Sequence, residues 1–153
     1  YTWQHMMVVP AAHALAAVER PTLEQLAAVP LVSYHPSFTG RTRIDAAFAR
    51  VRLAPEIVLE AIDSDVIKTY VRSGLGVGIV AEMAMRDEPA GSDLVSRPLG
   101  HLFGDNVSRV AFKRGAYLRS YVYTFAELLS ERLTRALIVK AMAGTSESSD
   151  PAL

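Results

Sequence analysis

Two segments of similar pattern decide the fold: Tyr34-His35-Pro36-Ser37-Phe38-Thr39-Gly40-Arg41 and Asp63-Ser64-Asp65-Val66-Ile67-Lys68-Thr69-Tyr70. Each segment follows an apolar run typical of a strand and opens a run with helical spacing. Such a junction places hydroxyl and backbone N–H groups at a helix N-terminus, where orphan donors and the helix dipole can hold an anion. Two helix starts of this kind along one sheet edge predict a ligand-binding cleft, and they do not by themselves indicate catalysis.

Strand-like and helical patterns alternate on both sides of these segments. Apolar runs typical of strands lie at residues 6–10, 31–34, 56–62, 77–80, 94–98 and 107–112. Helices are expected after the capping-box pair Thr22 and Gln25, over residues 66–73, and as one long final helix with an apolar face over residues 118–129. This alternation with short connections predicts an α/β layer architecture.

One further helix is predicted directly after Gly40. Ile44, Ala47, Phe48 and Val51 recur at i, i+3, i+4 and i+7, which predicts a single buried stripe. The stripe gives this helix one face for the core and leaves its other faces polar.

Three glycines, Gly74, Gly76 and Gly78, superficially resemble a dinucleotide-binding fingerprint. That fingerprint must follow a strand and open a helix, with different glycine spacing. Here the order is helix, glycines, strand. The pattern therefore favours a helix C-terminal cap followed by close packing of helix against sheet.

Bulk composition excludes several classes of protein. The 153 residues include 16 Lys and Arg and 16 Asp and Glu, so the formal net charge is zero, whereas a free-standing nucleic-acid-binding domain should carry a positive face. The absence of cysteine excludes disulfides and thiolate metal sites and favours a cytoplasmic protein. No apolar run approaches the roughly 18 residues that a membrane span needs. Because the sequence starts at Tyr1, almost directly in a strand-like run, we expect a fragment of a longer polypeptide.

The sequence holds no constellation typical of an enzyme or a metal site. The four histidines, His5, His13, His35 and His101, are scattered, and no two have i, i+4 spacing. There is no Gly-x-Ser-x-Gly elbow and no cysteine nucleophile. We therefore expect no catalytic residue, no metal and no cofactor.

The role of Thr39 stays open at this level. It is either an N-cap, a common structural role of threonine, or a hydroxyl donor that faces a ligand together with adjacent N–H groups. Asp63 and Asp65 lie at the other helix start, where the helix dipole explains them without acid–base chemistry. Lys68 and Arg41 could supply charge near a ligand, but the default expectation for both is a solvated surface residue.

The order of several motifs resembles that of a known family. The motifs are Pro30-Leu31-Val32-Ser33-Tyr34, Phe38-Thr39-Gly40-Arg41, Asp63-x-Asp65-Val66-Ile67-Lys68-Thr69-Tyr70-Val71-Arg72, Gly74-Leu75-Gly76-Val77-Gly78, Phe112-x-Arg114 and Leu118-Arg119-Ser120-Tyr121. Over residues 1–140 they resemble the effector-binding domain of LysR-type transcriptional regulators. The run 63–78 is similar to the cysteine-regulon activator subgroup in particular.

The resemblance implies a periplasmic-binding-protein-like fold of two α/β lobes around an effector cleft. On this basis residues 1–98 form a nearly complete lobe two, and residues 99–140 form the C-terminal part of lobe one, with the crossing near residues 94–106. Residues 141–153 are expected to be a disordered tail. In the family a winged helix-turn-helix and a linker helix precede this domain, and both they and the first units of lobe one are expected to lie outside this sequence.

The resemblance also implies where an effector binds. By motif, the ligand-contacting threonine of the family falls on Thr39, and the tryptophan near the cleft falls on Trp3. Phe38, Gly40 and Ser37 beside Thr39 complete the expected effector-binding residues.

The implied function is that of an effector sensor in a cytoplasmic regulator of sulfur assimilation and cysteine biosynthesis genes. The expected effector is a small anion or an acylated serine, of the class of sulfate, thiosulfate, O-acetylserine or N-acetylserine. The full-length protein is expected to be a homo-oligomer, a tetramer, that contacts DNA only through its helix-turn-helix and does not enter a membrane. The alternative is a periplasmic solute-binding protein for a small anion, which shares the fold; the run 63–78 favours the regulator.

Overall fold

The computed structural model describes residues 1–86, 88–89 and 91–144. The chain divides into two compact units, Tyr1–Ser108 and Arg109–Leu153. The first unit therefore extends beyond the region near residues 94–106 where the sequence predicts a crossing between lobes. Each unit is described by itself below.

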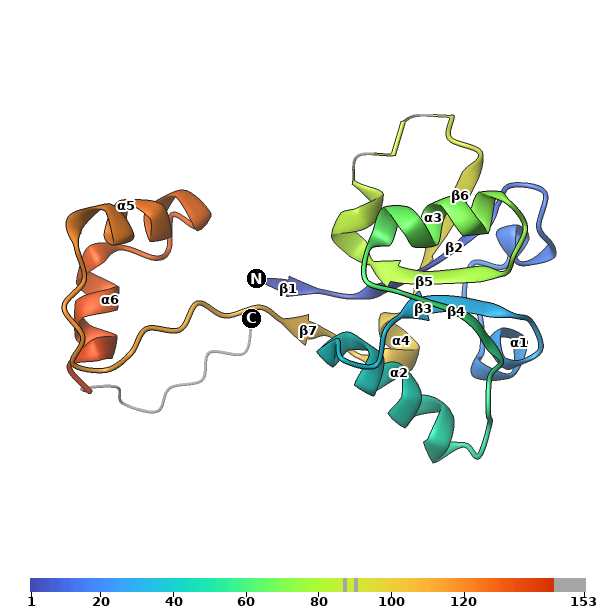
Figure 1. The fold of residues 1–153 in the computed structure, drawn as a ribbon, viewed down its shortest axis with the longest axis horizontal. Coiled ribbons are helices and arrows are strands. Elements are labelled where there is room, and N and C mark those ends of the chain that lie inside the picture. The colour runs from blue at the N-terminus through green and yellow to red at the C-terminus, as the bar shows by residue number, and fades with distance from the viewer. Residues whose placement is uncertain (87, 90, 145–153) are drawn as a thin grey trace. The chain divides into compact units, whose positions relative to one another are not determined.

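A mixed five-stranded sheet forms the centre of the first unit (Figure 1). Its strands are β2 (His5–Pro10), β3 (Leu31–Tyr34), β4 (Ile57–Ala61), β5 (Val77–Ala81) and β6 (Leu94–Pro98), in the spatial order β4-β3-β5-β2-β6. β3 pairs in parallel with β4 and β5, whereas β2 pairs antiparallel with β5 and β6. The predictions of strands at 6–10, 31–34, 56–62, 77–80 and 94–98 are confirmed.

Helices cover both faces of this sheet. They are α1 (Leu23–Ala27), α2 (Thr39–Arg50), α3 (Ser64–Arg72) and α4 (Gly100–Phe103), with 3₁₀ turns η1 (Ala14–Ala17) and η2 (Glu82–Met85). Strand side chains alternate between two cores, as the pleat requires. Met7 and Ile79 join the core under α1, α2 and α4, whereas Val8 and Val80 join the core under α3.

Local signals explain where two of these helices begin and end. The capping box of α1 is present: the Thr22 hydroxyl accepts from the Gln25 amide at 3.3 Å, and the Gln25 side chain accepts from the Thr22 amide at 2.9 Å. In α2 the predicted stripe is buried at Ile44, Ala47 and Phe48. Val51 does not belong to it, because α2 ends at Arg50 and the Val51 side chain is exposed.

The glycine run after α3 has the predicted structural role. Gly74 follows the helix with φ of +81°, a conformation that favours glycine. A Cβ on Gly76 would lie 2.5 Å from the Pro30 carbonyl oxygen, so the chain passes β3 too closely for any side chain. The helix cap is confirmed, and so is the close packing of helix against sheet, because a Cβ on Gly78 of β5 would lie 2.8 Å from the Val71 Cγ2 atom of α3.

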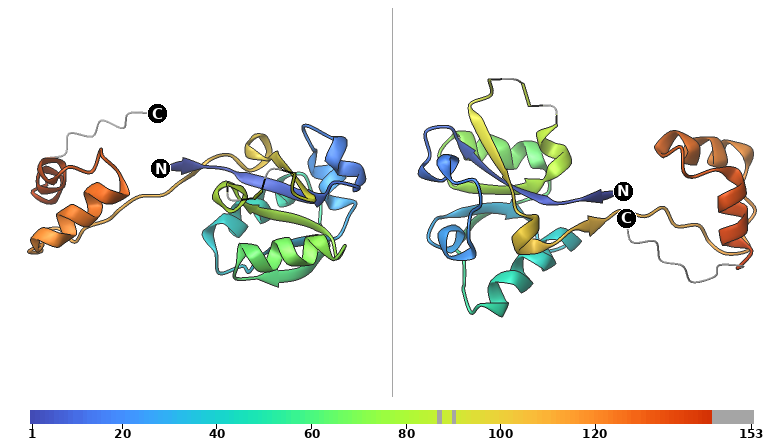
Figure 2. Two further views of the ribbon diagram at one scale, coloured as in Figure 1. Left: turned by 90° about the horizontal axis from the view of Figure 1, so that it is seen from above. Right: turned by 180° about the vertical axis from the view of Figure 1, so that it is seen from behind.

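Two short strands, β1 (Thr2–Trp3) and β7 (Asn106–Val107), pair with each other at the two ends of the first unit. The right-hand view of Figure 2 shows both strands, in blue and in orange. The expectation of a strand over residues 107–112 is wrong. β7 ends at Val107 because its partner β1 has only two residues, and no described strand pairs with residues 109–112.

The second unit contains α5 (Ser120–Leu129) and α6 (Arg135–Met142), so the expectation of one long final helix is also wrong. Ser130 adopts an extended conformation that ends α5, and Thr134 then caps α6 through a hydrogen bond from the Leu137 amide. Residues 141 and 142 belong to α6 and not to a disordered tail, and residues 145–153 of the expected tail lie outside the described residues.

The apolar face predicted for the final helix is mostly exposed within the second unit. Tyr121, Phe125 and Leu128 keep 60% or more of their surface, and Ala126 and Ile138 are the buried positions of the two helices. A face of this kind is normally covered by another segment or chain.

Replacing Gly76 tests the close packing of β5 against β3. We expect Gly76→Ala to lower the free energy of unfolding by about 3 kcal/mol, because the obstacle is backbone that cannot rotate away. Gly74→Ala is the matched control: its Cβ meets nothing within 4 Å, so only the left-handed conformation opposes it, by about 1 kcal/mol. Urea titration of both variants measures the difference, and equal losses would contradict the packing argument.

Candidate ligand-binding site

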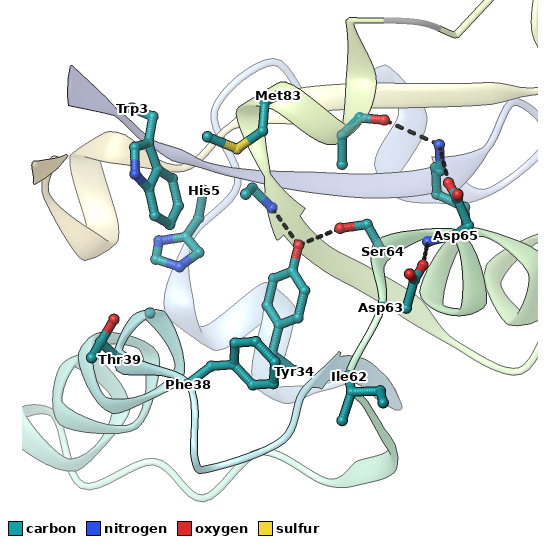
Figure 3. A pocket seen from close by; sticks show the side chains of 14 residues that line it. Trp3, His5, Tyr34, Phe38, Thr39, Ile62, Asp63, Ser64, Asp65 and Met83 are labelled. Carbon is teal, nitrogen blue, oxygen red and sulfur yellow. Dashed lines mark hydrogen bonds and ion pairs between the residues drawn. The ribbon is translucent and has the colours of Figure 1, made fainter. Parts of the chain in front are cut away.

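A cleft of about 770 Å³ opens in the first unit at the edge of the sheet where β3 and β4 end (Figure 3). Its walls come from Trp3 of β1, the start of β2, the first residues of α2 and α3, the end of β5 at Ala81, and Met83 and Ala84. Because β3 and β4 run in parallel, the helices that follow them both begin at this edge. The junctions that the sequence singles out are therefore brought together.

The start of α2 is open. Its N-cap is Phe38, which has extended φ and ψ and no side-chain cap, so the N-cap interpretation of Thr39 is wrong. Thr39 is the first helical residue, and it is exposed and lines the cleft. Among the residues that the structure describes, the amide N–H groups of Thr39 and Gly40 have no hydrogen-bond acceptor. Such unsatisfied donors at a helix N-terminus favour an anion.

The start of α3 is closed by its own chain. The Asp63 carboxylate caps this helix by accepting from the Asp65 amide at 2.6 Å, as the dipole interpretation predicts. A second negative group at this position would meet the charge of Asp63. Of the two helix starts that the sequence offers for an anion, only that of α2 is free of a carboxylate cap.

Tyr34, at the end of β3, connects the two sides of the cleft floor. Its hydroxyl accepts from the Ala81 amide at 3.0 Å and shares a hydrogen bond with the Ser64 hydroxyl at 2.6 Å. The side chain is 9% exposed and lies against the ring of Phe38. These bonds fix β5 and the start of α3 relative to β3.

His5, the first residue of β2, lies buried in the wall beside α2. Its ring is enclosed edge-on by Trp3 and Phe103, at centroid distances of 5.3 and 5.7 Å. Burial, assisted by the positive charge of Arg43, lowers the pKa of His5 from 6.5 to about 4. The imidazole is therefore neutral at pH 7.

Arg41 is not the solvated surface residue that we expected. Its side chain is 8% exposed, donates to the Tyr34 carbonyl at 2.8 Å, and forms ion pairs with Asp45 and Glu60 at 2.8 and 3.0 Å. Burial acts to lower the pKa of Arg41, but the two carboxylates outweigh it and hold the pKa above its ordinary value. The positive charge of Arg41 is neutralised by carboxylates of the same chain, because a buried cation needs such partners.

Lys68 lines the cleft, and it too is not a solvated residue. Its ammonium group pairs with Asp65 and Glu88, both at 2.9 Å, and donates to the Ala84 carbonyl at 3.1 Å. Burial acts to lower the pKa of Lys68, but these carboxylates raise it above its ordinary value. All three protons of the ammonium group thus have acceptors within the chain.

Four of the five predicted effector-binding residues line the cleft, namely Trp3, Phe38, Thr39 and Gly40. Ser37 does not line it; its hydroxyl lies 2.9 Å from the His35 Nδ1 atom. Sequence reasoning missed His5 and Tyr34 as cleft residues. One signal could have found His5: the alternation of residues 5–9 places it on the buried face of the strand, with Met7 and Val9.

The described residues contain neither a helix that could span a membrane nor a cluster of side chains that could bind a metal ion. No helix there is long and apolar enough to cross a membrane. Among the same residues, no group of three or more His, Asp or Glu side chains lies where it could hold a metal ion.

A mixed α/β unit with a ligand-sized cleft at the ends of parallel strands defines a small-molecule-binding domain. The chain belongs to the family of LysR substrate binding domains, whose family model matches residues 1–134. Domains of this family have a periplasmic-binding-protein-like two-lobe fold.

Several named relatives are similar to this chain. It is 56% identical to the HTH-type transcriptional regulator CysB of Burkholderia cenocepacia over 149 residues, which cover 97% of this chain and 47% of that protein. It is 44% identical to the regulator SsuR of the same organism, covering 90% of this chain and 44% of SsuR. The chain thus spans about half the length of the curated relatives it matches.

Solved structures agree with this family. The cofactor-binding domain of the Cbl transcriptional regulator superimposes with a TM-score of 0.79 at 41% identity, covering 93% of this chain and 62% of that domain. The CcmR regulatory domain of Synechocystis PCC6803 superimposes with a TM-score of 0.70 at 16% identity, over 88% of this chain and 64% of that domain, which shows the shared fold alone.

The ion pairs around Lys68 predict a defined dependence of stability on pH. The hydrogen bond from Lys68 lowers the pKa of Glu88 below its ordinary 4.5. Glu88 therefore stabilises the fold above pH 4.5, and this stabilisation is lost as the pH falls through the lower folded-state pKa. We expect Glu88→Gln to be less stable than the parent at pH 7, and the difference to shrink as the pH falls below 4.5.

Chemical denaturation at a series of pH values measures this difference. Glu19→Gln is the control, because Glu19 is exposed and should change stability at no pH. A difference between Glu88→Gln and the parent that stays constant from pH 7 to pH 3 would contradict the role of Glu88 as an ion-pair partner.

Proposed function

We propose that this chain is the effector-binding region of a LysR-type transcriptional regulator of sulfur assimilation or cysteine biosynthesis genes. The observation that carries the proposal is the open start of α2, where the Thr39 hydroxyl and two unpaired amides face the cleft. In this proposal the first unit is lobe two and the second unit is the C-terminal part of lobe one.

The proposed effector is a small anion or an acylated serine, of the class of sulfate, thiosulfate, O-acetylserine or N-acetylserine. Each offers oxygen acceptors to the donors at the start of α2, where the helix dipole also favours negative charge. Lys68 and Arg41 are excluded as partners of the effector, because both are already paired with carboxylates. Recognition therefore rests on neutral donors and the helix start.

The proposed protein is a cytoplasmic homo-oligomer, a tetramer at full length, that binds DNA through a helix-turn-helix outside this chain. The names of the relatives, HTH-type transcriptional regulators, support the DNA-binding part of this proposal and do not favour a periplasmic solute-binding protein or an enzyme. An effector would shift this regulator between states only by the difference in its affinity for them.

Thr39→Ala is the test of the proposed site. Losing a hydrogen bond to a charged group removes about 1.5–3 kcal/mol, so we expect roughly a ten- to hundredfold weaker effector binding. The free energy of unfolding should stay nearly unchanged, because Thr39 caps no helix. Calorimetric titration of the full-length protein with the four effectors, beside a melting curve, measures both quantities.

Thr22→Ala supplies the matched control, because Thr22 is a true N-cap remote in sequence from the cleft. It should lower stability by about 1 kcal/mol and leave effector affinity unchanged. Thr39→Ser keeps the hydroxyl and should bind nearly as the parent does. If Thr39→Ala bound each effector as tightly as the parent, Thr39 would be excluded from the site.

We further expect this chain alone to have no sequence-specific affinity for DNA. Its formal net charge is zero, and tight protein–DNA binding depends on neutralising phosphates. A gel-shift assay with a cysteine-regulon promoter at about 150 mM salt tests this. Tight binding that weakens steeply with salt would show a DNA-binding surface within these residues.

A further inference from the structure

Resting on the proposed function, we infer that His5 determines ligand specificity, by donating from Nε2–H to an oxygen of the anionic group held at the start of α2. The ligand class is thereby narrowed to oxyanions and carboxylates with at least two acceptor oxygens. One oxygen faces the Thr39 end of α2, and another faces the imidazole.

The first step is the unsatisfied nitrogen itself. The His5 side chain has no exposed surface, and its Nε2 atom has no hydrogen-bond partner within the described part of the chain. A buried polar atom of this kind is rare in native proteins and needs an explanation. Because His5 lines the cleft, a ligand oxygen is a natural acceptor.

The hydrogen bond at the other ring nitrogen sets the tautomer. The Asn106 Nδ2 group lies 3.4 Å from His5 Nδ1, and an amide nitrogen can only donate. Nδ1 is therefore the acceptor, which leaves the single hydrogen of the neutral ring on Nε2. Nε2 is consequently a hydrogen-bond donor whose acceptor is missing, and a ligand oxygen could be that acceptor.

Nε2 is directed at the open helix start. A Cβ built on Gly40 would lie 2.9 Å from His5 Nε2 and 3.6 Å from the Cη2 atom of Trp3. Glycine at position 40 thus allows the imidazole to approach the first turn of α2. The N–H of His5, the hydroxyl of Thr39 and the unpaired amides of α2 meet in one region, as Figure 3 shows for the labelled side chains.

The surroundings of His5 favour an anion beside Nε2, although no cationic side chain is proposed to contact that anion. Arg43 contributes positive charge near the ring and, with burial, keeps the imidazole neutral. Trp3 and Phe103 hold the plane of the ring from two sides. Because the Trp3 ring lies against His5 and lines the same cleft, an anion bound at Nε2 should also change the fluorescence of Trp3.

The test is a pair of variants of the full-length protein titrated with sulfate. His5→Asn can still accept from Asn106, but its short side chain cannot reach the Nε2 position. His5→Gln carries an amide N–H at about the reach of Nε2. We expect His5→Asn to bind sulfate about ten- to hundredfold more weakly and His5→Gln to bind within about threefold of the parent.

Nitrogen-15 NMR of the parent gives an independent measurement if either variant folds poorly. We expect the His5 ring to carry its hydrogen on Nε2 and the Nε2–H signal to shift when sulfate is added. A hydrogen on Nδ1, or an unchanged Nε2–H signal in the sulfate-saturated protein, would overturn the inference.

Thr39→Ala, titrated beside the His5 variants, separates this inference from the proposed function. Weaker sulfate binding by Thr39→Ala together with parental binding by His5→Asn would overturn the role of His5 and leave the proposed site standing. Equal losses in His5→Asn and His5→Gln would overturn the donor role as well. A parent protein that binds none of the four proposed effectors would overturn both conclusions.

Discussion

The parallel pairing of β3 with both β4 and β5 is the constraint on which the cleft depends. The chain leaves β3, forms α2 and returns in β4 on one side; it then forms α3 and crosses back over β3 to reach β5 on the other side. Right-handed crossovers in opposite directions place the two helices on opposite faces, and the two cores confirm this arrangement. The helix starts then diverge at one sheet edge, where α/β proteins bind ligands.

Tyr34 and Arg41 hold this edge together. The Tyr34 carbonyl accepts from Arg41 of α2, while its hydroxyl bonds to Ser64 of α3 and Ala81 of β5. Arg41 also reaches Glu60 of β4. One tyrosine and one arginine thereby connect three strands and two helices, so the cleft is formed before any ligand arrives. A preformed site loses less conformational entropy on binding.

Features that depend on neighbouring residues were predicted well from the sequence, whereas contacts between residues far apart in the chain were predicted poorly. The capping box at Thr22, the strand at 31–34 and the glycine cap at Gly74 depend on neighbours within a few residues, and all are confirmed. The burial of Lys68 depends on Glu88, twenty residues further along the chain, which no local pattern indicates.

The candidate site shows the same division. The motif that carries Thr39 predicted the correct helix start, but an N-cap and a first helical residue differ only in backbone angles, which sequence does not fix within a residue or two. The unsatisfied nitrogen of His5 was beyond prediction, because its tautomer depends on Asn106, which reaches it only through the pairing of β1 with β7.

In the proposed site, the chemical difference between the two helix starts would orient a ligand. Carboxylates of Asp63 and Asp65 lie at α3, whereas donors alone lie at the start of α2, so a negative group is favoured at α2 and disfavoured at α3. His5 lies beside the start of α2, and it contacts one residue on each of two short strands. These are Trp3 on β1, through a ring contact, and Asn106 on β7, through a hydrogen bond. Those are the strands at which the first unit begins and ends. An effector changes a conformational equilibrium only by contacts that differ between states. The contact proposed at His5 would act directly on these two strands.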